Sequence, residues 1–213
     1  MVADRIHLVR HGEVHNPKGV LYGRLPNFGL SQLGHEMAAK AAGELQELGR
    51  PISALYSSPL QRTRESAKPI SQAFGLTAII DERLIEPHNI FEGRVIRGGK
   101  ILLKPHLWFH LRNPSQPSWG EPYRQIVERM RAAIIDAANS VAGGDVVLVS
   151  HQLPIWMIHS LAVGAKLPHN PTQRRCALSS ITSFELDGDR LVEVDYRDPS
   201  AELRERAKDV GAV

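Results

Sequence analysis

The sequence predicts an α/β protein in which helices cover both faces of a mostly parallel sheet. Short apolar runs with strand character alternate along the chain with longer segments of helical period, which is the pattern of parallel strands joined by helical crossovers. Near the end of the chain, two further strand-like runs are joined by the turn sequence DGD at residues 187–189. This second observation predicts an antiparallel hairpin at the edge of the sheet.

Strands are predicted where short runs of apolar and β-branched residues occur. The run at residues 6–9 is the first, and the run DVVLVS at residues 145–150 is the clearest, because nearly continuous apolar residues are typical of a strand that is buried on both faces. The predicted strands are residues 6–9, 52–56, 76–80, 145–150, 181–186 and 191–196.

Helices are predicted between these strands, where apolar residues recur at helical spacing and capping residues mark the ends. Ser31 is a suitable N-cap for the first helix, which Gly49 ends, and Pro59 suits the first turn of the second helix, which Gly75 ends. Pro122 is expected to start a long amphipathic helix. The predicted helical segments are residues 31–49, 58–75, 122–141 and about 154–161.

The chain is expected to form one domain over residues 1–213, because this length suits one large core and is short for two. Residues 92–119 contain three prolines and three glycines and show no regular pattern. We expect a lid or insertion at about residues 92–121, and a charged tail that frays from Ala201 onward.

Composition is typical of soluble globular proteins, with 42% hydrophobic and 23% charged residues. No apolar run approaches the roughly 18 to 20 residues that cross a bilayer, and the N-terminus does not resemble a signal peptide. The single cysteine, Cys176, cannot form an internal disulfide. We therefore expect a cytoplasmic protein that does not bind a membrane; its oligomeric state stays open, with a dimer among the alternatives.

Polar residues stand directly after several of the predicted strands or in the segments that follow them. In open parallel sheets, ligands bind beyond the carboxyl ends of the strands, so these residues should meet at one rim. The residues are Arg10, His11, Arg62, Glu86 and His151. Two guanidinium groups, two imidazoles and one carboxyl group at one rim indicate phosphoryl chemistry.

A phosphoryl group carries nearly two negative charges, and its transfer depends on positioning and on electrostatic stabilisation. Arg10 and Arg62 would bind its oxygens as planar forks, and His151 would donate a further hydrogen bond. Neighbouring guanidinium groups should lower the pKa of His11 and favour a neutral, nucleophilic ring, whose other nitrogen needs an acceptor to fix the tautomer. Gly12 leaves room for close approach of the backbone.

The leaving oxygen needs a proton. Glu86 is our first candidate for the donor, because a carboxyl group beside a bound phosphate should keep its proton to a higher pH. Glu92 and His88 are the alternatives.

These residues lie in segments that resemble the histidine phosphatase superfamily, the phosphoglycerate-mutase-like proteins. LVRHGE at residues 8–13 resembles the signature of the family, SSPLQR at residues 57–62 its second arginine motif, and VSH at residues 149–151 its second histidine motif. Further resemblances are Gly34 with the helix after it, LIE at residues 84–86 with Glu92 and Gly93, and WGE at residues 119–121. These segments follow one another in the same order as in the family, across nearly the whole chain.

The resemblance implies a three-layer α/β/α fold and a phosphohistidine intermediate on His11, without a metal or another cofactor. It also implies phosphate contacts from Arg10, Arg62 and His151, with Glu86 as proton donor.

Three further residues, Asn16, Gly23 and Gln152, are expected to contact substrate. The resemblance is incomplete at two of them. Asn16 stands five positions after His11, whereas the family asparagine stands six positions after the nucleophile, and Gln152 stands where glycine is common.

The basic segment within the expected lid allows two interpretations. The net charge is +3 and the pI near 9.2, and residues 94–112 hold five Lys or Arg side chains and two histidines, with no acid between Glu92 and Glu121. The segment is either a solvated face or a lid that attracts a phosphorylated substrate. No nucleic-acid-binding module accompanies it, so a nucleic-acid partner is not expected. Its His106 and His110 have helical spacing but no HExxH motif or acidic partner, so no metal site is expected.

Three functions from different classes remain: a phosphomonoester hydrolase, a mutase for a phosphorylated metabolite, and a non-catalytic phosphate-binding regulatory module. Mutases of the family carry a Glu-Arg-x-Tyr-Gly run near the acid donor and a His-Gly-Asn run, and neither occurs here. A regulatory module is disfavoured because all five rim residues are in place. We therefore predict a hydrolase from the phosphatase branch that acts on a small phosphorylated metabolite.

Overall fold

The computed structural model describes residues 2–95 and 120–209. Within these ranges, six strands form one sheet in the order β3-β2-β4-β1-β5-β6. The strands are β1 Ile6–Arg10, β2 Ile52–Ser57, β3 Ile79–Ile80, β4 Asp145–Ser150, β5 Ile181–Asp187 and β6 Arg190–Arg197. The helices are α1 Gln32–Glu47, α2 Gln61–Phe74, α4 Tyr123–Asn139 and α5 Gln152–Ala162, with 3-10 turns at η1 Glu82–Leu84, η3 Pro171–Gln173 and η4 Ala201–Arg206.

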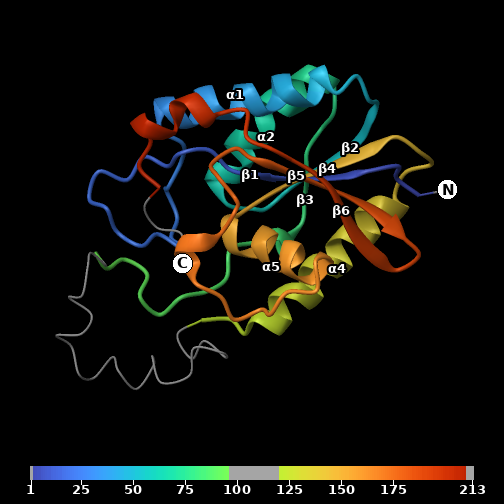
Figure 1. Ribbon diagram of the computed structural model, residues 1–213. Helices are drawn as coiled ribbons and strands as arrows, with labels where there is room; N and C mark the ends of the chain where they lie inside the picture. The colour runs from blue at the N-terminus through green and yellow to red at the C-terminus, as the bar shows by residue number, and fades with distance from the viewer. Residues whose placement is uncertain (1, 96–119, 210–213) are drawn as a thin grey trace.

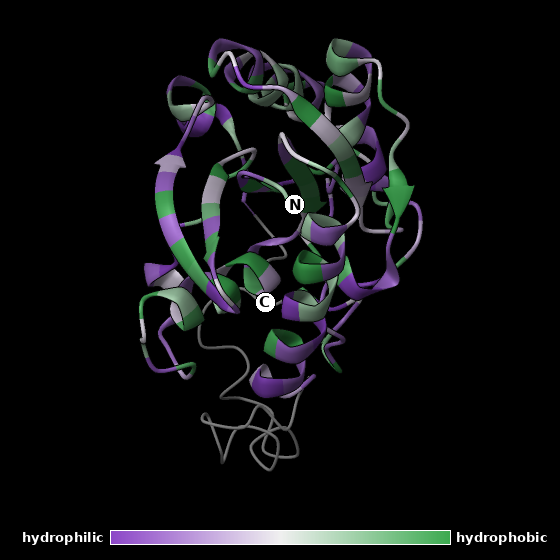
Figure 2. Cartoon of the chain, turned by 90° about the vertical axis from the view of Figure 1, so that its right-hand side faces the viewer, coloured by the Kyte–Doolittle hydropathy of each residue, from purple (hydrophilic) through white to green (hydrophobic). Residues whose placement is uncertain are grey.

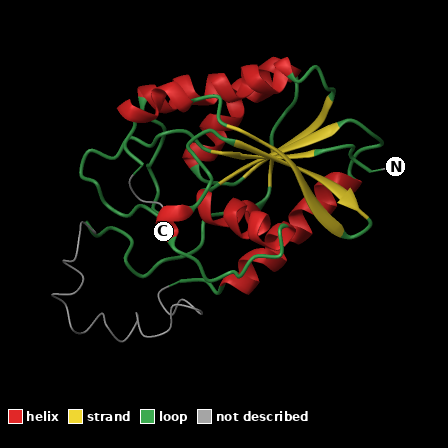
Figure 3. Ribbon diagram, in the orientation of Figure 1, coloured by secondary structure: helices red, strands yellow, loops and turns green. Residues whose placement is uncertain are grey.

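The sheet lies between two helical layers, with α1 and α2 on one face and α4 and α5 on the other (Figure 1 and Figure 3). The side chains of β4 alternate between the two cores. Val147 and Val149 pack in the cluster that contains residues of α1 and α2, whereas Val146 and Leu148 pack in the cluster that contains residues of α4 and α5. The predicted three-layer α/β/α architecture is thus confirmed.

The parallel strands end at a common rim. β1 and β2 both pair in parallel with β4, and β3 pairs in parallel with β2. β5 runs antiparallel to β1 and forms the hairpin with β6 at the edge, as predicted. Because parallel strands point the same way, the segments that leave the carboxyl ends of β1, β2 and β4 begin on one side of the molecule.

Helix amphipathicity explains why these segments fold against the sheet. In α4, buried Ile126, Met130, Ile134 and Ala137 recur at intervals of three and four residues, which places them on one face. Figure 2 shows the helices banded with hydrophobic and hydrophilic residues, as helices that have one face in a core are expected to be.

Two element boundaries differ from the predictions. β3 contains only Ile79 and Ile80, about half exposed, because it pairs on one side with only two residues of β2. The second helix begins at Gln61 rather than at residue 58, because the Ser58 N–H donates to the Val149 carbonyl and so continues the contact of β2 with β4.

Other predicted boundaries agree more closely. Ser31 is the N-cap of α1, with its hydroxyl accepting from Gly34 N, and Pro122 directly precedes α4. The tail that we expected to fray from Ala201 forms the 3-10 turn η4, whose Leu203 is buried, and it is described as far as residue 209.

The expected lid at residues 92–121 lies largely outside the described residues, since residues 96–119 are not described. The basic side chains from Arg97 to Arg112, together with His106 and His110, fall in that range. Of the helices in the described ranges, none combines the length and the apolar character that crossing a bilayer requires.

Two glycines bring the loop after β1 against the start of α1. A side chain on Gly12 would collide with the carbonyl of Gly34, and one on Gly34 would collide with the carbonyl of Glu13. Both obstacles are backbone atoms, which cannot rotate away. The position of the segment that carries His11 therefore depends on the absence of both side chains.

A pair of identical substitutions in α1 tests this junction. Gly34→Ala should destabilise the fold by about 1–3 kcal/mol, because the new methyl group forces two backbone segments apart. Gly43→Ala is the matched control, because a Cβ at that position meets nothing within 4 Å and alanine should stabilise the helix by about 0.5–1 kcal/mol. Urea unfolding of both variants measures the difference, and equal shifts for the two would contradict the role of the junction.

Candidate active site

The register between β1 and β4 brings two of the predicted residues together. Arg10 lies opposite Ser150, and the His11 N–H donates to the Ser150 carbonyl at 3.1 Å. The rings of His11 and His151, which follow these strands, have centroids 5.2 Å apart in an edge-to-face arrangement. Two histidines that are 140 positions apart in the sequence thus lie side by side in one site.

His11 has the environment of a neutral nucleophile. Its side chain is buried, and Nδ1 lies 2.8 Å from the Gly12 carbonyl oxygen, so Nδ1 carries the proton and Nε2 keeps its lone pair. Burial, followed by the charges of Arg62 and Arg10, lowers the pKa of His11 well below its usual value. The direction agrees with the sequence argument, although burial, and not either guanidinium charge, is the largest single cause.

Two buried guanidinium groups lie beside this ring, each held by the backbone of another segment. Arg10 donates from Nη1 to the Cys176 carbonyl at 2.7 Å, and Arg62 donates from Nη2 to the Gly23 carbonyl at 2.8 Å. The ring of Tyr22 lies 4.7 Å from the Arg62 guanidinium carbon, which gives a cation–π contact.

The tail supplies a carboxylate partner to Arg10. Asp209 accepts from Nη1 at 2.8 Å and from Nη2 at 2.5 Å. Burial is the largest single cause and acts to lower the pKa of Arg10, but the charge and the hydrogen bonds of Asp209, with smaller effects of Cys176 and Tyr22, together outweigh it. The net shift is upward, so the guanidinium stays charged. Before an oxyanion can use these two nitrogens, it must compete with Asp209.

Four polar atoms of this cluster are buried and have no hydrogen-bond partner in the structure. They are Arg10 Nε, Arg62 Nε, Glu86 Oε1 and His151 Nδ1, and they make up most of the seven such atoms in the described ranges. Buried polar groups without partners are costly and uncommon. Their gathering at one place provides donors and an acceptor that a bound ligand could use.

Glu86 lies next to the second histidine. Its Oε2 is 3.4 Å from His151 Nδ1, and burial raises the pKa of Glu86 against the opposing charges of Arg62, Arg174 and Arg10. The backbone of this residue is held in place, because Arg24 Nε donates to its carbonyl at 2.6 Å. A carboxyl group in this setting retains its proton to a higher pH than an exposed one.

The two alternative donors are placed differently. Glu92 Oε1 accepts from the backbone N–H groups of Arg24 and Asn89, at 3.1 and 3.2 Å, and therefore stabilises a loop. The side chain of His88 is 60% exposed. The geometry favours Glu86 over both.

His151 is buried and is held by Ser58, whose Oγ lies 2.8 Å from His151 Nε2. Burial is also the largest cause that lowers the pKa of His151. Ser58 is the last residue before Pro59 at the end of β2, so three strand ends contribute to the site.

The three further residues that we expected to contact substrate form hydrogen bonds within the protein, and their contact with substrate stays a prediction. The amide of Asn16 bonds to the backbone of Val20, donating at 2.8 Å and accepting at 3.2 Å. Gly23 offers its carbonyl to Arg62, as described above. Gln152 accepts from Arg174 Nη1 at 3.2 Å and donates to the Cys176 carbonyl at 3.3 Å.

Several neighbours of the site escaped the sequence analysis. Ser58 lies inside the second arginine motif, so its position was a usable signal. Tyr22, Arg174, Cys176 and Asp209 lie in loops without a motif, and no spacing rule relates them to the strands. Across residues 2–95 and 120–209, no group of three or more metal-binding side chains gathers.

This arrangement can bind a tetrahedral oxyanion and attack its central atom. Two guanidinium groups and an imidazole supply donors, a neutral imidazole nitrogen supplies a nucleophile, and a carboxyl group of raised pKa supplies a proton. Together these are the groups that phosphoryl transfer through a covalent intermediate requires.

Comparisons with known proteins agree with this chemistry. A sequence model of the histidine phosphatase superfamily (branch 1) matches residues 6–199. The uncharacterized protein Rv0525 of Mycobacterium tuberculosis is 50% identical over 198 residues, which cover 92% of this chain and 97% of that protein. The probable phosphoglycerate mutase GpmB of Yersinia pestis is 29% identical over 185 residues, which cover 83% of this chain and 84% of that protein.

Among solved structures, the mycobacterial glucosyl-3-phosphoglycerate phosphatase Rv2419c in complex with VO3 has the same fold. Its TM-score is 0.75 at 22% sequence identity, and the match covers 92% of this chain and 98% of that chain.

The ion pair between Asp209 and Arg10 can be tested with inorganic phosphate. Asp209→Asn keeps the shape of the side chain but removes the charge that competes for Arg10, so phosphate should bind about 3- to 10-fold more tightly. Isothermal titration measures this, with Asp189→Asn in the β5–β6 turn as the control. Weaker binding by the Asp209 variant would show instead that the carboxylate holds Arg10 in position for the anion.

Proposed function

The chain belongs to the histidine phosphatase superfamily, and we therefore propose that it hydrolyses phosphomonoesters by carrying the phosphoryl group on His11. The single observation that supports this most directly is the state of His11: a buried ring, tied through Nδ1 to a carbonyl and flanked by two guanidinium groups. We also propose that the substrate is a small phosphorylated metabolite, that the protein works in the cytoplasm, and that catalysis needs no metal ion.

In the first step, Nε2 of His11 attacks phosphorus and the bond from phosphorus to the ester oxygen breaks. Arg10, Arg62 and His151 stabilise the charge that the equatorial oxygens carry in the transition state. Glu86 gives its proton to the departing oxygen, so the leaving group departs as an alcohol.

In the second step, a water molecule attacks the phosphohistidine. Glu86, now ionised, takes a proton from this water, the bond between phosphorus and Nε2 breaks, and inorganic phosphate leaves. His11 returns to its neutral form and Glu86 to its protonated form, so atoms and charges balance over the cycle.

A phosphoglycerate-type mutase is the second candidate, supported by the similarity to GpmB. It would return the phosphoryl group to another hydroxyl of the same metabolite instead of to water. The missing mutase sequence runs favour hydrolysis. The two are separated by whether isomerised product or free phosphate accumulates.

Substitution of the nucleophile tests the proposed intermediate. His11→Ala should reduce phosphate release from p-nitrophenyl phosphate, measured with a chelator present, by about a thousandfold or more, because no phosphohistidine can form. His15→Ala, at an exposed histidine four positions away, should leave the rate unchanged. A phosphoryl adduct found by mass spectrometry on the parent should be absent from His11→Ala. Hydrolysis by that variant at the parental rate would disprove the assignment.

The proton donor can be identified from its dependence on pH and on the leaving group. Glu86 must be protonated to act, so activity toward an alkyl phosphate should fall as the pH rises through the raised pKa of this residue. Glu86→Gln should lose about 10²- to 10⁴-fold with the alkyl ester. The loss should be much smaller with p-nitrophenyl phosphate, whose leaving group needs no proton.

Glu92→Gln is the comparison for this experiment. It should keep the alkaline fall in activity that Glu86→Gln abolishes. If Glu92→Gln abolished the alkaline fall in activity and Glu86→Gln kept it, Glu92 would be the proton donor.

A further inference from the structure

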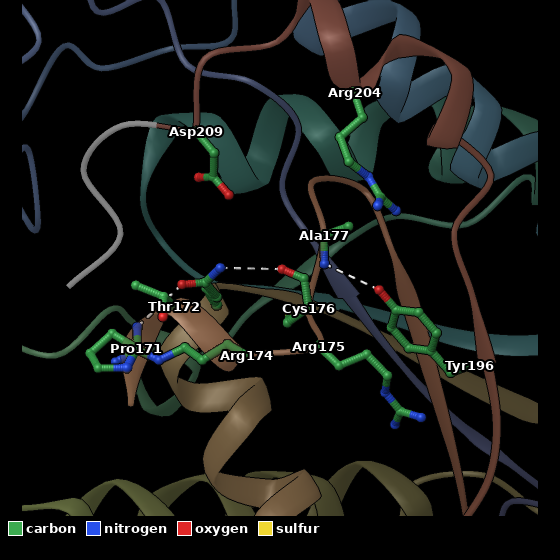
Figure 4. A pocket seen from close by; sticks show the side chains of 10 residues that line it. Pro171, Thr172, Arg174, Arg175, Cys176, Ala177, Tyr196, Arg204 and Asp209 are labelled. Carbon is green, nitrogen blue, oxygen red and sulfur yellow. Dashed lines mark hydrogen bonds between the residues drawn. The ribbon is translucent and has the colours of Figure 1, made fainter. Parts of the chain in front are cut away.

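A cavity of about 500 Å³ lies beside the two segments that hold Arg10 (Figure 4). Six of the residues that line it are Gln152, Thr172, Arg174, Cys176, Tyr196 and Asp209. Cys176 and Asp209 are the contacts of the Arg10 guanidinium described above, so this cavity adjoins the oxyanion site. It has the size of a site for a small metabolite.

Arg174 is tied to the catalytic cluster by a chain of hydrogen bonds. It donates from Nη1 to Gln152, which in turn donates to the Cys176 carbonyl, and Arg10 donates to the same carbonyl. On its other side, Arg174 Nε donates to His169 Nε2 at 2.8 Å. The guanidinium is therefore fixed in position relative to Arg10.

The charge of Arg174 acts on the leaving-group side of the site. It is the second largest cationic influence on the pKa of Glu86, after Arg62, and Glu86 is in turn the first of the charges that oppose the effect of burial on the pKa of Arg174. Gln152, which accepts from Arg174, directly follows His151, and His151 Nδ1 lies 3.4 Å from Glu86 Oε2. Arg174 is therefore placed on the side of the site where Glu86 would protonate the leaving oxygen.

Two other arginines, Arg175 and Arg204, also line the cavity. Arg175 forms an ion pair with Glu193 and stacks over the ring of Tyr196, 4.4 Å from its centroid, whereas Arg204 is paired with Asp198. Figure 4 shows the side chains of Arg174 and Arg175 leaving their loop in opposite directions. Of these two neighbours, Arg174 is the one that is linked to Glu86.

We propose that Arg174 binds a second anionic group, a carboxylate, on the leaving-group part of the substrate. The arginine fork would bind two oxygens of this group while Arg10 and Arg62 bind the phosphoryl group that is transferred. The substrate class is thus a phosphomonoester of a small acid. This inference rests on the proposed function, which it makes more specific.

The test compares two esters that differ in one group. In 3-phosphoglycerate a carboxylate stands where glycerol 3-phosphate has a hydroxymethyl group. The parent protein should hydrolyse the acid with the higher kcat/KM. In R174Q the ratio of kcat/KM for the acid to kcat/KM for glycerol 3-phosphate should fall about 10- to 100-fold, because any change at Glu86 or Arg10 affects both esters and only the acid carries the group that Arg174 binds.

R175Q is the matched control, because it removes the same charge from the adjacent position. It should keep the preference for the acid. R174K should keep part of it, because lysine retains the charge but loses the planar fork. Thermal unfolding of each variant shows whether it is folded, and the ratio of the two kcat/KM values is independent of the active fraction.

Two results would overturn the proposal: a parent that does not prefer the acid, or an equal loss on both esters in R174Q. Both results are distinct from failure of the proposed function. If His11→Ala remained active, the phosphohistidine mechanism would fail. If His11→Ala were inactive while R174Q kept its selectivity, only the role of Arg174 would fail.

Discussion

The parallel pairing of β1 with β4 is the constraint on which the site depends. Its register places Arg10 opposite Ser150, so His11 and His151 leave neighbouring strands at the same height. A slip of one residue would turn the side chains of either strand to the opposite face of the sheet, and Val146 and Leu148 would lose their core against α4 and α5. The apolar alternation that builds the two cores therefore also sets the distance between the two imidazoles.

Burial then gives the side chains their chemistry. In water near neutral pH, a carboxyl group is ionised and an imidazole is partly protonated. Enclosure reverses both tendencies, because it disfavours whichever form carries charge: His11 becomes a neutral base and Glu86 tends to keep its proton. Burial also disfavours the charged form of Arg10, but the ion pair with Asp209 helps to keep its guanidinium charged. One rim of the sheet can thus hold a nucleophile and an acid together.

Strand-end residues could be predicted from the sequence because local pattern determines them. A buried strand has a recognisable apolar run, and the residues after it must reach the rim. The surrounding residues have no such rule: Asp209 meets Arg10 across almost the full length of the chain, and Arg174 reaches the site through a loop that follows α5. Asn16 was expected from the family resemblance although its offset from His11 differs by one residue, and in the structure its amide closes the loop to Val20.

The contact between Gly12 and Gly34 has a consequence for how the molecule can change over generations. Each of the two positions is restricted by the backbone of the other segment. A substitution at one position is therefore tolerated only if the backbone of the other segment also moves, which is epistasis between close neighbours. The loop that bears His11 and the first helix should therefore diverge as a coupled pair.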